Sequence, residues 1–302
     1  MIGADLADAT ALAQAVAGKR LVLNAAGPFK LTGTPLMSAA LAAHVDYLDL
    51  NGELAALEDL FALDERAQAS GVALIGGAGF GVAATDGLAR RAVELLGGAD
   101  WLRLSVAADS AFSSPAVAES VLEALAGGGR EIEEGKLQKR AMGRRRWRET
   151  LPDGEQISFA SAPLAELAAV ARATQVARIV AGVPMPGTQA VILAQIAPML
   201  PALLRIPAVR TALAGAGGHG GKSVVKTEHR SRVWVEAGRG QRRVIARLAA
   251  GEGFAAAADI AILAVEATLT RRPEPGAHTP ATAFGSHFIA DVPGVGVTFE
   301  QS

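Results

Sequence analysis

The sequence predicts an α/β protein in which a parallel sheet is followed by a second unit with a mostly antiparallel sheet. Continuous apolar runs at 21–26, 45–50 and 71–76 are typical of strands buried on both faces, and helix-forming stretches separate them. Farther along, several segments alternate apolar and polar residues, as strands with one solvated face do. The chain has 302 residues, which is enough for two domains.

The composition excludes several classes of protein and site. Half of the residues are hydrophobic and 20% are charged, which is typical of a folded globular chain. The formal net charge of -1 gives no reason to expect nucleic-acid binding. The absence of cysteine excludes disulfides and thiolate ligands, and five histidines without an i, i+4 pair argue against a metal site. The first residues do not resemble a signal peptide, so we expect a cytoplasmic protein.

The parallel unit begins with a strand over 21–26, which ends before Pro28 because proline cannot donate a ladder hydrogen bond. A helix is predicted over 35–43, with Pro35 in its first turn, and a second strand over 45–50. In such β-α-β units ligands bind beyond the carboxyl ends of the strands. The residues at these two ends are Asn24, Gly27, Pro28 and Phe29, then Asp49, Asn51, Gly52 and Glu53.

The next elements repeat this pattern. A helix is predicted over 53–69 and a third buried strand over 71–76, followed by a glycine-rich turn over 76–81. Glycines after a parallel strand let the backbone approach a ligand closely, although they also permit a tight turn without any ligand. Thr85 or Asp86 is the expected cap of the helix that follows.

From residue 101 the pattern changes to that of a substrate domain with a mostly antiparallel sheet. We expect a strand at its start, then a helix, a polar linker over 127–136 and two hairpins. The predicted segments are 101–109 and 114–126 for the strand and helix, 144–150 with 156–160 for the first hairpin, and 228–237 with 242–249 for the second.

The most hydrophobic window, 188–206, approaches the length of a membrane span but contains Pro198 and other interruptions. We expect a buried or surface-docked helix that is broken near Pro198, and we favour contact with a lipid or an acyl chain over a membrane span. The segment 216–223 satisfies a relaxed phosphate-loop pattern. Since a helical stretch precedes it and a strand follows it, we reject nucleotide triphosphate binding and expect a loop that covers the site.

Three motifs in order resemble the saccharopine dehydrogenase-like oxidoreductases, including the trans-acting enoyl reductases. In that family one strand ends in N-x-x-G-P-[FY], the next in Y-x-D-x-x-G-E, and a third leads into G-F-D-x-x-P-x-D. The chain departs from the pattern at Gly81 and Ala84, where the family has an acid and a proline. The matching residues are Asn24, Gly27, Pro28 and Phe29, then Tyr47, Asp49, Gly52 and Glu53, then Gly79, Phe80 and Asp86.

The resemblance implies an incomplete Rossmann-like parallel sheet at 1–99, a substrate domain at 100–272, and a last segment, 273–302, that packs back on the first domain. No GxGxxG turn precedes the first strand, so we expect an N-terminally truncated chain whose first β-α-β unit is missing. The implied cofactor is NAD or NADP. The residues expected to bind it are Asp5, Asn24, Ala26, Gly27, Pro28, Phe29, Gly79 and Phe80.

Hydride transfer needs a cleft with little water and a nearby acid. Tyr47 is the only tyrosine and is a candidate proton donor, with Asp49 or Glu53 as its partner or as the acid itself. Two alternatives remain open. The Tyr47 ring could fill the core beneath the strand end, and Glu53 could cap the helix that follows it.

Two functions follow. The first is an NAD(P)-dependent oxidoreductase that acts on a small or acyl-type, hydrophobic substrate. The second is a truncated, catalytically silent relative that binds a lipid or a protein partner. In that case a homodimer would cover the sheet edge that the missing strands leave open.

Overall fold

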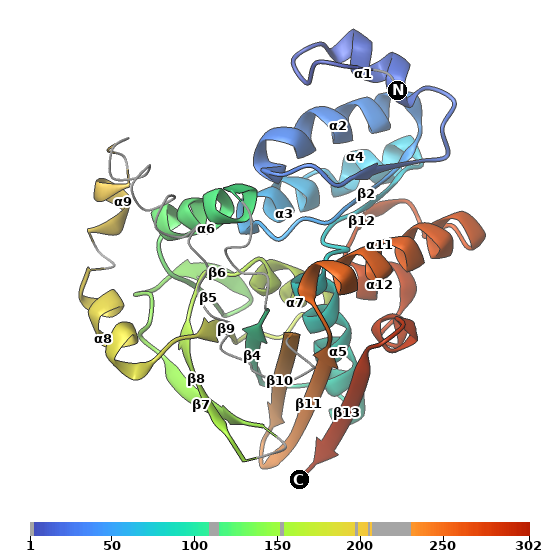
Figure 1. Ribbon diagram of the computed structural model, residues 1–302. Helices are drawn as coiled ribbons and strands as arrows, with labels where there is room; N and C mark the ends of the chain where they lie inside the picture. The colour runs from blue at the N-terminus through green and yellow to red at the C-terminus, as the bar shows by residue number, and fades with distance from the viewer. Residues whose placement is uncertain (1–2, 109–114, 152–153, 197–198, 205, 207–230) are drawn as a thin grey trace.

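Two β-sheets organise the chain, and Figure 1 shows the smaller, sheet A, above the larger, sheet B. The computed structural model describes all residues except 1–2, 109–114, 152–153, 197–198, 205 and 207–230. The segment 216–223, expected to be a loop over the site, lies outside the described residues. The predicted fold class, a parallel sheet with a mostly antiparallel one, is confirmed.

Sheet A is parallel throughout and has four strands in the order β1-β2-β3-β12. The first three come from the N-terminal segment, and the fourth comes from near the C-terminus. The last segment of the chain therefore contributes a strand to the N-terminal sheet. The strands are β1 (Leu21–Asn24), β2 (Asp46–Asp49), β3 (Ala73–Ile75) and β12 (Gly276–His278).

Helix α1 (Ala9–Val16) precedes β1 and packs on α2, and three helices connect the first strands of sheet A: α2 (Phe29–Ala43), α3 (Leu54–Phe61) and α4 (Asp64–Ser70). The prediction that a helix begins at Pro35 is wrong, since α2 begins six residues earlier, at Phe29, and Pro35 lies inside it. The single helix expected over 53–69 is divided into α3 and α4. The division lets Asp64, the first residue of α4, accept a hydrogen bond at 2.8 Å from the Ala277 backbone N–H of β12.

Helix α5 (Phe80–Leu96) connects the two sheets. It packs against the sheet B strands β10 and β11, and its buried side chains join Leu48 and Ile75 of sheet A to Val233 and Val235 of sheet B in one core. The expectation that Thr85 or Asp86 caps this helix is wrong, because Gly79 is the N-cap residue and both side chains lie within the helix.

Sheet B has nine strands, with the order β13-β11-β10-β4-β9-β5-β6 and the hairpin β7-β8 joined to β9. Pairing is antiparallel except between β4 and β9. The strands are β4 (Trp101–Ala107), β5 (Arg130–Glu133), β6 (Lys136–Lys139), β7 (Arg146–Thr150), β8 (Gln156–Ser161), β9 (Ile179–Pro184), β10 (Ser231–Arg239), β11 (Arg242–Ala250) and β13 (Gly296–Gln301).

Both predicted hairpins of this unit form, but the expected polar linker over 127–136 is wrong. From Arg130 onward this stretch belongs to the hairpin β5-β6. The hairpin turns at Glu134 and Gly135, which have φ angles of 53° and 72°. Two residues with positive φ make the tight turn that matches the twist of paired strands. Ile132, buried at the centre of β5, anchors this hairpin in the core.

The remaining helices cover sheet B or lie beside it: α6 (Pro115–Gly127), α7 (Glu166–Thr174), α8 (Gly187–Ile196), α9 (Leu200–Leu203), α11 (Gly253–Thr270), α12 (Pro280–Phe284) and the 3-10 helix η1 (Phe288–Asp291). The described residues of the hydrophobic window 188–206 include two helices, α8 and α9, and Pro198, where we expect the break, lies outside the described residues. Among the described helices, α11 is the one with the length and hydropathy of a membrane span, and one third of it is buried.

Candidate functional site

The candidate site lies where the parallel strands β1, β2 and β3 end, because the loops that follow them meet there. Asp49, the last residue of β2, joins these loops. Its Oδ1 accepts hydrogen bonds from the backbone N–H of Asn51 at 3.0 Å and of Gly77 at 2.8 Å. Its backbone carbonyl accepts a third from the N–H of Ala78 at 2.7 Å. One residue therefore fixes the loop after β2 and the loop after β3.

Burial makes the Asp49 carboxyl group a weaker acid than an exposed aspartate. The side chain is 2% exposed. Desolvation raises its pKa to about 6, although hydrogen bonds from Gly77, Asn51 and Tyr47 counteract part of that rise. Near neutral pH the group is therefore close to its titration range while it holds the two loops.

Tyr47 lies entirely inside this network. Its hydroxyl donates to Asp49 Oδ2 at 3.0 Å and accepts from Asn24 Nδ2 at 3.1 Å. The residue is 0% exposed. Burial, together with the charge of Asp49, raises the pKa of the hydroxyl above its ordinary value. With no surface open to a ligand, this geometry favours the alternative that the Tyr47 ring fills the core.

Asn24 and Thr32 hold the loop after β1 from beneath. The Asn24 side chain donates to Thr32 Oγ1 at 3.0 Å and accepts from the Ala26 N–H at 3.1 Å. The Thr32 hydroxyl in turn donates to the Ala26 carbonyl at 2.6 Å. Both polar groups of the Ala26 backbone are thus fixed, although the loop itself is exposed.

Glu53 occupies the N-terminus of α2. Its Oε1 accepts from the Phe29 N–H and its Oε2 from the Lys30 N–H, each at 2.9 Å. The Ser120 hydroxyl of α6 donates to Oε1 at 2.7 Å. A carboxylate at a helix N-terminus is stabilised by the unpaired N–H groups and by the helix dipole. Glu53 is also the N-cap residue of α3 by position, but its side chain makes no capping bond there. Its side chain thus caps the preceding helix and contacts the second unit.

The predicted cofactor-binding residues divide into exposed and buried groups. Ala26 and Gly27 are exposed, and Pro28 and Phe29 are partly so, at the start of α2. Gly79 and Phe80 are buried. A methyl group added to Gly79 would lie 3.0 Å from the Leu50 carbonyl oxygen, so this glycine permits close packing of two loops. The loop after β1 therefore offers the accessible surface.

Asp5, Asp86 and Glu166 complete the set of acids near these elements. Asp5 is exposed in the N-terminal loop, and its carboxylate accepts from the Ala7 N–H at 2.9 Å. Asp86 accepts from the Ala281 N–H at 2.8 Å and ties α5 to the start of α12. Burial raises the pKa of both Asp86 and Glu166 to about 7.

The sequence reasoning did not single out Glu166. It lies at the start of α7, is 7% exposed, and its Oε1 would be 2.5 Å from a methyl group added to Gly81 in the first turn of α5. The departure from the family motif at Gly81 is the signal that could have directed attention to this place, because a side chain at this position would displace the Glu166 carboxyl group. Within the described part of the chain, no group of three or more His, Asp or Glu side chains could hold a metal ion.

Comparison with known proteins gives a local sequence match and a shared fold. No protein-family model matches the chain. A probable mitochondrial saccharopine dehydrogenase-like oxidoreductase of Arabidopsis thaliana is 33% identical over 81 residues, which are 26% of this chain and 18% of that protein. The match thus spans about a fifth of the relative's length.

Among solved structures, apo saccharopine dehydrogenase (L-Glu forming) of Saccharomyces cerevisiae has a TM-score of 0.54 and 12% identity over 99% of this chain and 88% of that one. GenD2 from gentamicin A biosynthesis, in complex with NAD, has a TM-score of 0.34 and 14% identity over 95% and 76% of the two chains. The first likeness shows that this chain and the yeast enzyme share a fold. Over 81 residues the chain is thus similar in sequence to a saccharopine dehydrogenase-like oxidoreductase, and it shares the fold of saccharopine dehydrogenase.

Proposed function

We propose that the protein is an oxidoreductase that binds NAD or NADP with the nicotinamide end of the cofactor against the strand-end loop, residues 25–27. The observation that supports this is the exposure of residues 25–27 at the carboxyl end of β1, while Asn24 and Thr32 fix the loop from beneath. Ligands of open parallel sheets bind at this position, and a preorganised loop loses little entropy when a ligand binds.

The charges around the loop favour the nicotinamide over the phosphates. The N-terminus of α2 already holds the Glu53 carboxylate, and the Glu166 carboxyl lies over the first turn of α5 at Gly81. The Glu53 carboxylate would repel a phosphate at the N-terminus of α2, although such ends are ordinarily good anion sites, and the Glu166 carboxyl group occupies the corresponding space at α5. The uncharged amide and ribose of a reduced nicotinamide are compatible with this surface.

The three residues expected to be catalytic act, in this proposal, by positioning the loop. Tyr47 and Asp49 are buried beneath it and hold its neighbours. Glu53 is the member of this group that contacts the second unit, through Ser120 of α6, and so lies closest to where a substrate would enter between the units. We propose a small or acyl-type substrate with a hydrophobic part.

The test is a fluorescence titration of the full chain with NADH and with NADPH. Binding tighter than millimolar supports the proposal, and the comparison of the two cofactors shows which is preferred. The loop itself is tested with Ala26→Asp, which adds a negative charge to an exposed position beside Gly27. We expect this variant to bind at least about tenfold more weakly, a loss of about 1.4 kcal/mol in binding free energy.

The matched control is Ala62→Asp, at an exposed alanine that follows the last turn of α3. This variant adds the same charge at the C-terminal end of α3, outside the strand-end loop, and should leave the affinity for the cofactor unchanged. If wild-type protein binds neither cofactor, the oxidoreductase proposal fails for this chain. If both variants weaken binding equally, the nicotinamide does not lie on the strand-end loop.

A second candidate, a catalytically silent relative that binds a lipid or a protein, is favoured by the surface of α8 and α9. Large apolar side chains gather there in exposed positions, and an exposed apolar patch of this kind marks an interaction surface. The exposed fractions are 42% for Val191, 42% for Ile196, 60% for Met199, 38% for Leu203 and 48% for Ile206.

Sedimentation with vesicles of neutral and of anionic phospholipid tests the lipid form of this candidate. Met199→Glu should abolish sedimentation if the α8–α9 surface enters the lipid. Leu31→Glu is the control, because Leu31 on α2 is also exposed, at 68%, but lies away from these helices. Failure of wild-type protein to sediment, together with cofactor binding, would eliminate the lipid-binding candidate.

A further inference from the structure

Among the residues that the structure describes, no strand pairs with the outer edge of strand β13 (Gly296–Gln301). This strand lies at the end of sheet B, and Figure 1 shows it at the side of the molecule near the C-terminus. In the described ranges its one neighbour is β11. Proteins ordinarily protect such an edge with lysine, proline or a bulge, because its free N–H and C=O groups can pair with another strand. The six residues of β13, Gly-Val-Thr-Phe-Glu-Gln, include neither lysine nor proline.

The register with β11 identifies the backbone groups that face outward. Ser302 and Arg243 exchange two hydrogen bonds, at 2.8 and 3.0 Å. In an antiparallel ladder such bonded pairs alternate with pairs whose N–H and C=O groups point away. The groups of Glu300 and Thr298 therefore face β11. Those of Val297, Phe299 and Gln301 face outward.

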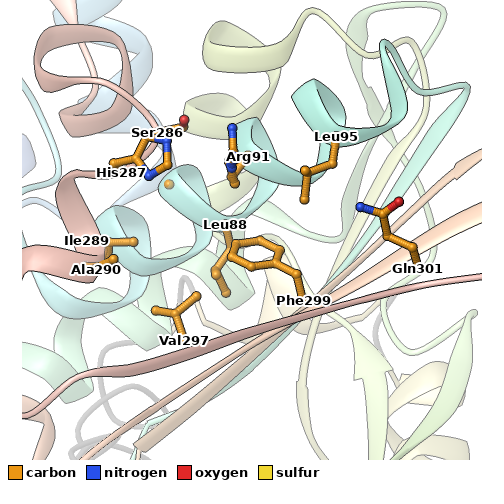
Figure 2. Close-up of a pocket in the computed structure, with 11 residues that line it drawn as sticks. Leu88, Arg91, Leu95, Ser286, His287, Ile289, Ala290, Val297, Phe299 and Gln301 are labelled. Carbon is orange, nitrogen blue, oxygen red and sulfur yellow. The ribbon is translucent and has the colours of Figure 1, made fainter.

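The same three residues carry their side chains on the face that α5 covers. Figure 2 shows Val297 and Phe299 on the side of the strand where Leu88 lies, and a cavity of about 290 Å³ separates β13 from the helix. Most of its lining is apolar, including Leu95 and Ile289. Phe299 is 37% exposed. The free edge thus combines outward hydrogen-bonding groups with an apolar hollow.

We propose that two copies of this chain pair through β13, antiparallel, about a two-fold axis at Phe299. In this register Phe299 lies opposite the partner subunit's Phe299, and Val297 lies opposite the partner subunit's Gln301. Every outward N–H and C=O of the three residues then finds a partner. The two sheets become one continuous sheet, and the two hollows face each other across the axis, so that the Phe299 rings are buried between the α5 helices.

The charges on the opposite face fit a second copy. Glu300 forms an ion pair with Arg247 of β11 at 2.8 Å, and Arg247 lies directly opposite Thr298 in the ladder. In the proposed register the partner subunit's Glu300 lies opposite Thr298. Each Arg247 then lies near two carboxylates. One is Glu300 of its own subunit, and the other is the partner subunit's Glu300, which lies beyond Thr298 in the same row across the strands. A cross-strand pair of opposite charge favours association, whereas two like charges in this position would oppose it.

The first experiment measures the mass of the full chain by sedimentation over a range of concentrations. Wild-type protein should be a dimer, and Phe299→Lys, which places a charge at the axis, should be a monomer at the concentrations where the wild type is dimeric. Leu23→Lys is the matched control. Leu23 lies in β1, an edge strand of sheet A, and is 43% exposed, so it tests a different sheet edge. A monomeric wild type, or dissociation of the Leu23 variant alone, would overturn the proposal.

The second experiment needs no variant and therefore holds even if Phe299→Lys does not fold. Amide hydrogen exchange of the wild-type chain is followed residue by residue at high and at low protein concentration. The amides of Val297, Phe299 and Gln301 should exchange at least about tenfold faster on dilution, because their partners are lost. Those of Thr298 and Glu300 should stay protected by β11. Equal exchange of Phe299 at both concentrations would refute the pairing. Neither experiment depends on the proposed oxidoreductase activity.

Discussion

The Glu53 carboxylate and the Phe29 backbone N–H, 24 positions apart in the sequence, are joined by a hydrogen bond of 2.9 Å. Because Phe29 is the first residue of α2 and Glu53 follows β2, this bond fixes the start of one helix to the end of the next strand. The strand-end loop between β1 and α2 is thereby held on one side by Glu53 and on the other by Asn24. The proposed cofactor surface is thus built before any ligand binds.

Replacement of Glu53 by glutamine should lower the free energy of unfolding by about 1–3 kcal/mol. The amide NH2 of glutamine would face one of two backbone donors, and the favourable charge at the helix N-terminus would be lost. Urea unfolding measures the change. Glu58→Gln is the control, because Glu58 is exposed on α3 and should change the stability by less than about 0.5 kcal/mol. Equal effects of the two changes would show that the α2 cap contributes nothing.

Replacement of Tyr47 by phenylalanine distinguishes the structural from the catalytic role of the hydroxyl. Loss of the bond to Asp49 and of the bond from Asn24 should cost about 1–3 kcal/mol in unfolding free energy. The affinity for the reduced cofactor should stay within about threefold of wild type, because Asn24 and Thr32 still hold the loop after β1, and Asn51 and Gly77 still donate to Asp49. A variant that is as stable as wild type but binds cofactor weakly would restore the role of Tyr47 at the site.

Part of this arrangement follows from sequence patterns. Apolar runs predicted β1, β2 and β3, and the parallel order placed Asn24 and Asp49 at one edge of the sheet. The residues named for the site on the loops after β1 and β2 lie around that edge because strand ends are local features. By contrast, the role of Glu53 depends on how a side chain crosses from one loop to the next helix. Such a contact has no signature in spacing, and neither has the contact of Asp86 with Ala281, which is 195 positions away.

The wrong predictions of a helix start at Pro35 and of a linker over 127–136 have one physical origin: tertiary contacts override the local propensity of the sequence. Pro35 is a good first-turn residue, but Glu53 caps the chain at Phe29 and so starts α2 earlier. The stretch 127–136 is rich in glycine and glutamate, which is typical of a linker. Ile132 nonetheless enters the core, and the turn at Glu134 and Gly135 closes a hairpin around it.

The buried Glu166 carboxyl predicts a dependence of stability on pH. Its pKa in the folded protein, about 7, lies above the ordinary value of 4.5, because burial disfavours the charged form. The folded state therefore holds this proton more tightly than the unfolded state. The resulting stabilisation is complete below about pH 4.5 and is lost as the pH rises through 7, a change of up to about 3 kcal/mol.

Glu166→Gln should accordingly raise the unfolding free energy at pH 8 by about 1–3 kcal/mol and leave it nearly unchanged at pH 5. Urea unfolding at the two values measures this difference. Glu65→Gln, at an exposed position in the first turn of α4, is the control and should show no such pH dependence. A Glu166 variant that is less stable at pH 8 would mean that the carboxylate has a partner outside the described residues.

Gly77 provides the sharpest test of how tightly the three loops are packed. Its φ angle is +81°, which disfavours any residue with a side chain, and an added methyl group would lie 2.4 Å from Val82 Cγ1. Gly77→Ala should therefore lower the free energy of unfolding by about 2–4 kcal/mol. In Gly52→Ala, in the neighbouring loop, the added methyl group meets no atom within 4 Å, and the free energy of unfolding should change by less than about 0.5 kcal/mol.

Because Gly77 also donates to Asp49, its displacement should weaken cofactor binding as well, whereas the Gly52 variant should bind normally. Tolerance of alanine at Gly77 would mean that Asp49 does not fix the loop after β3 in solution, and the proposed preorganisation of the site would lose its physical basis.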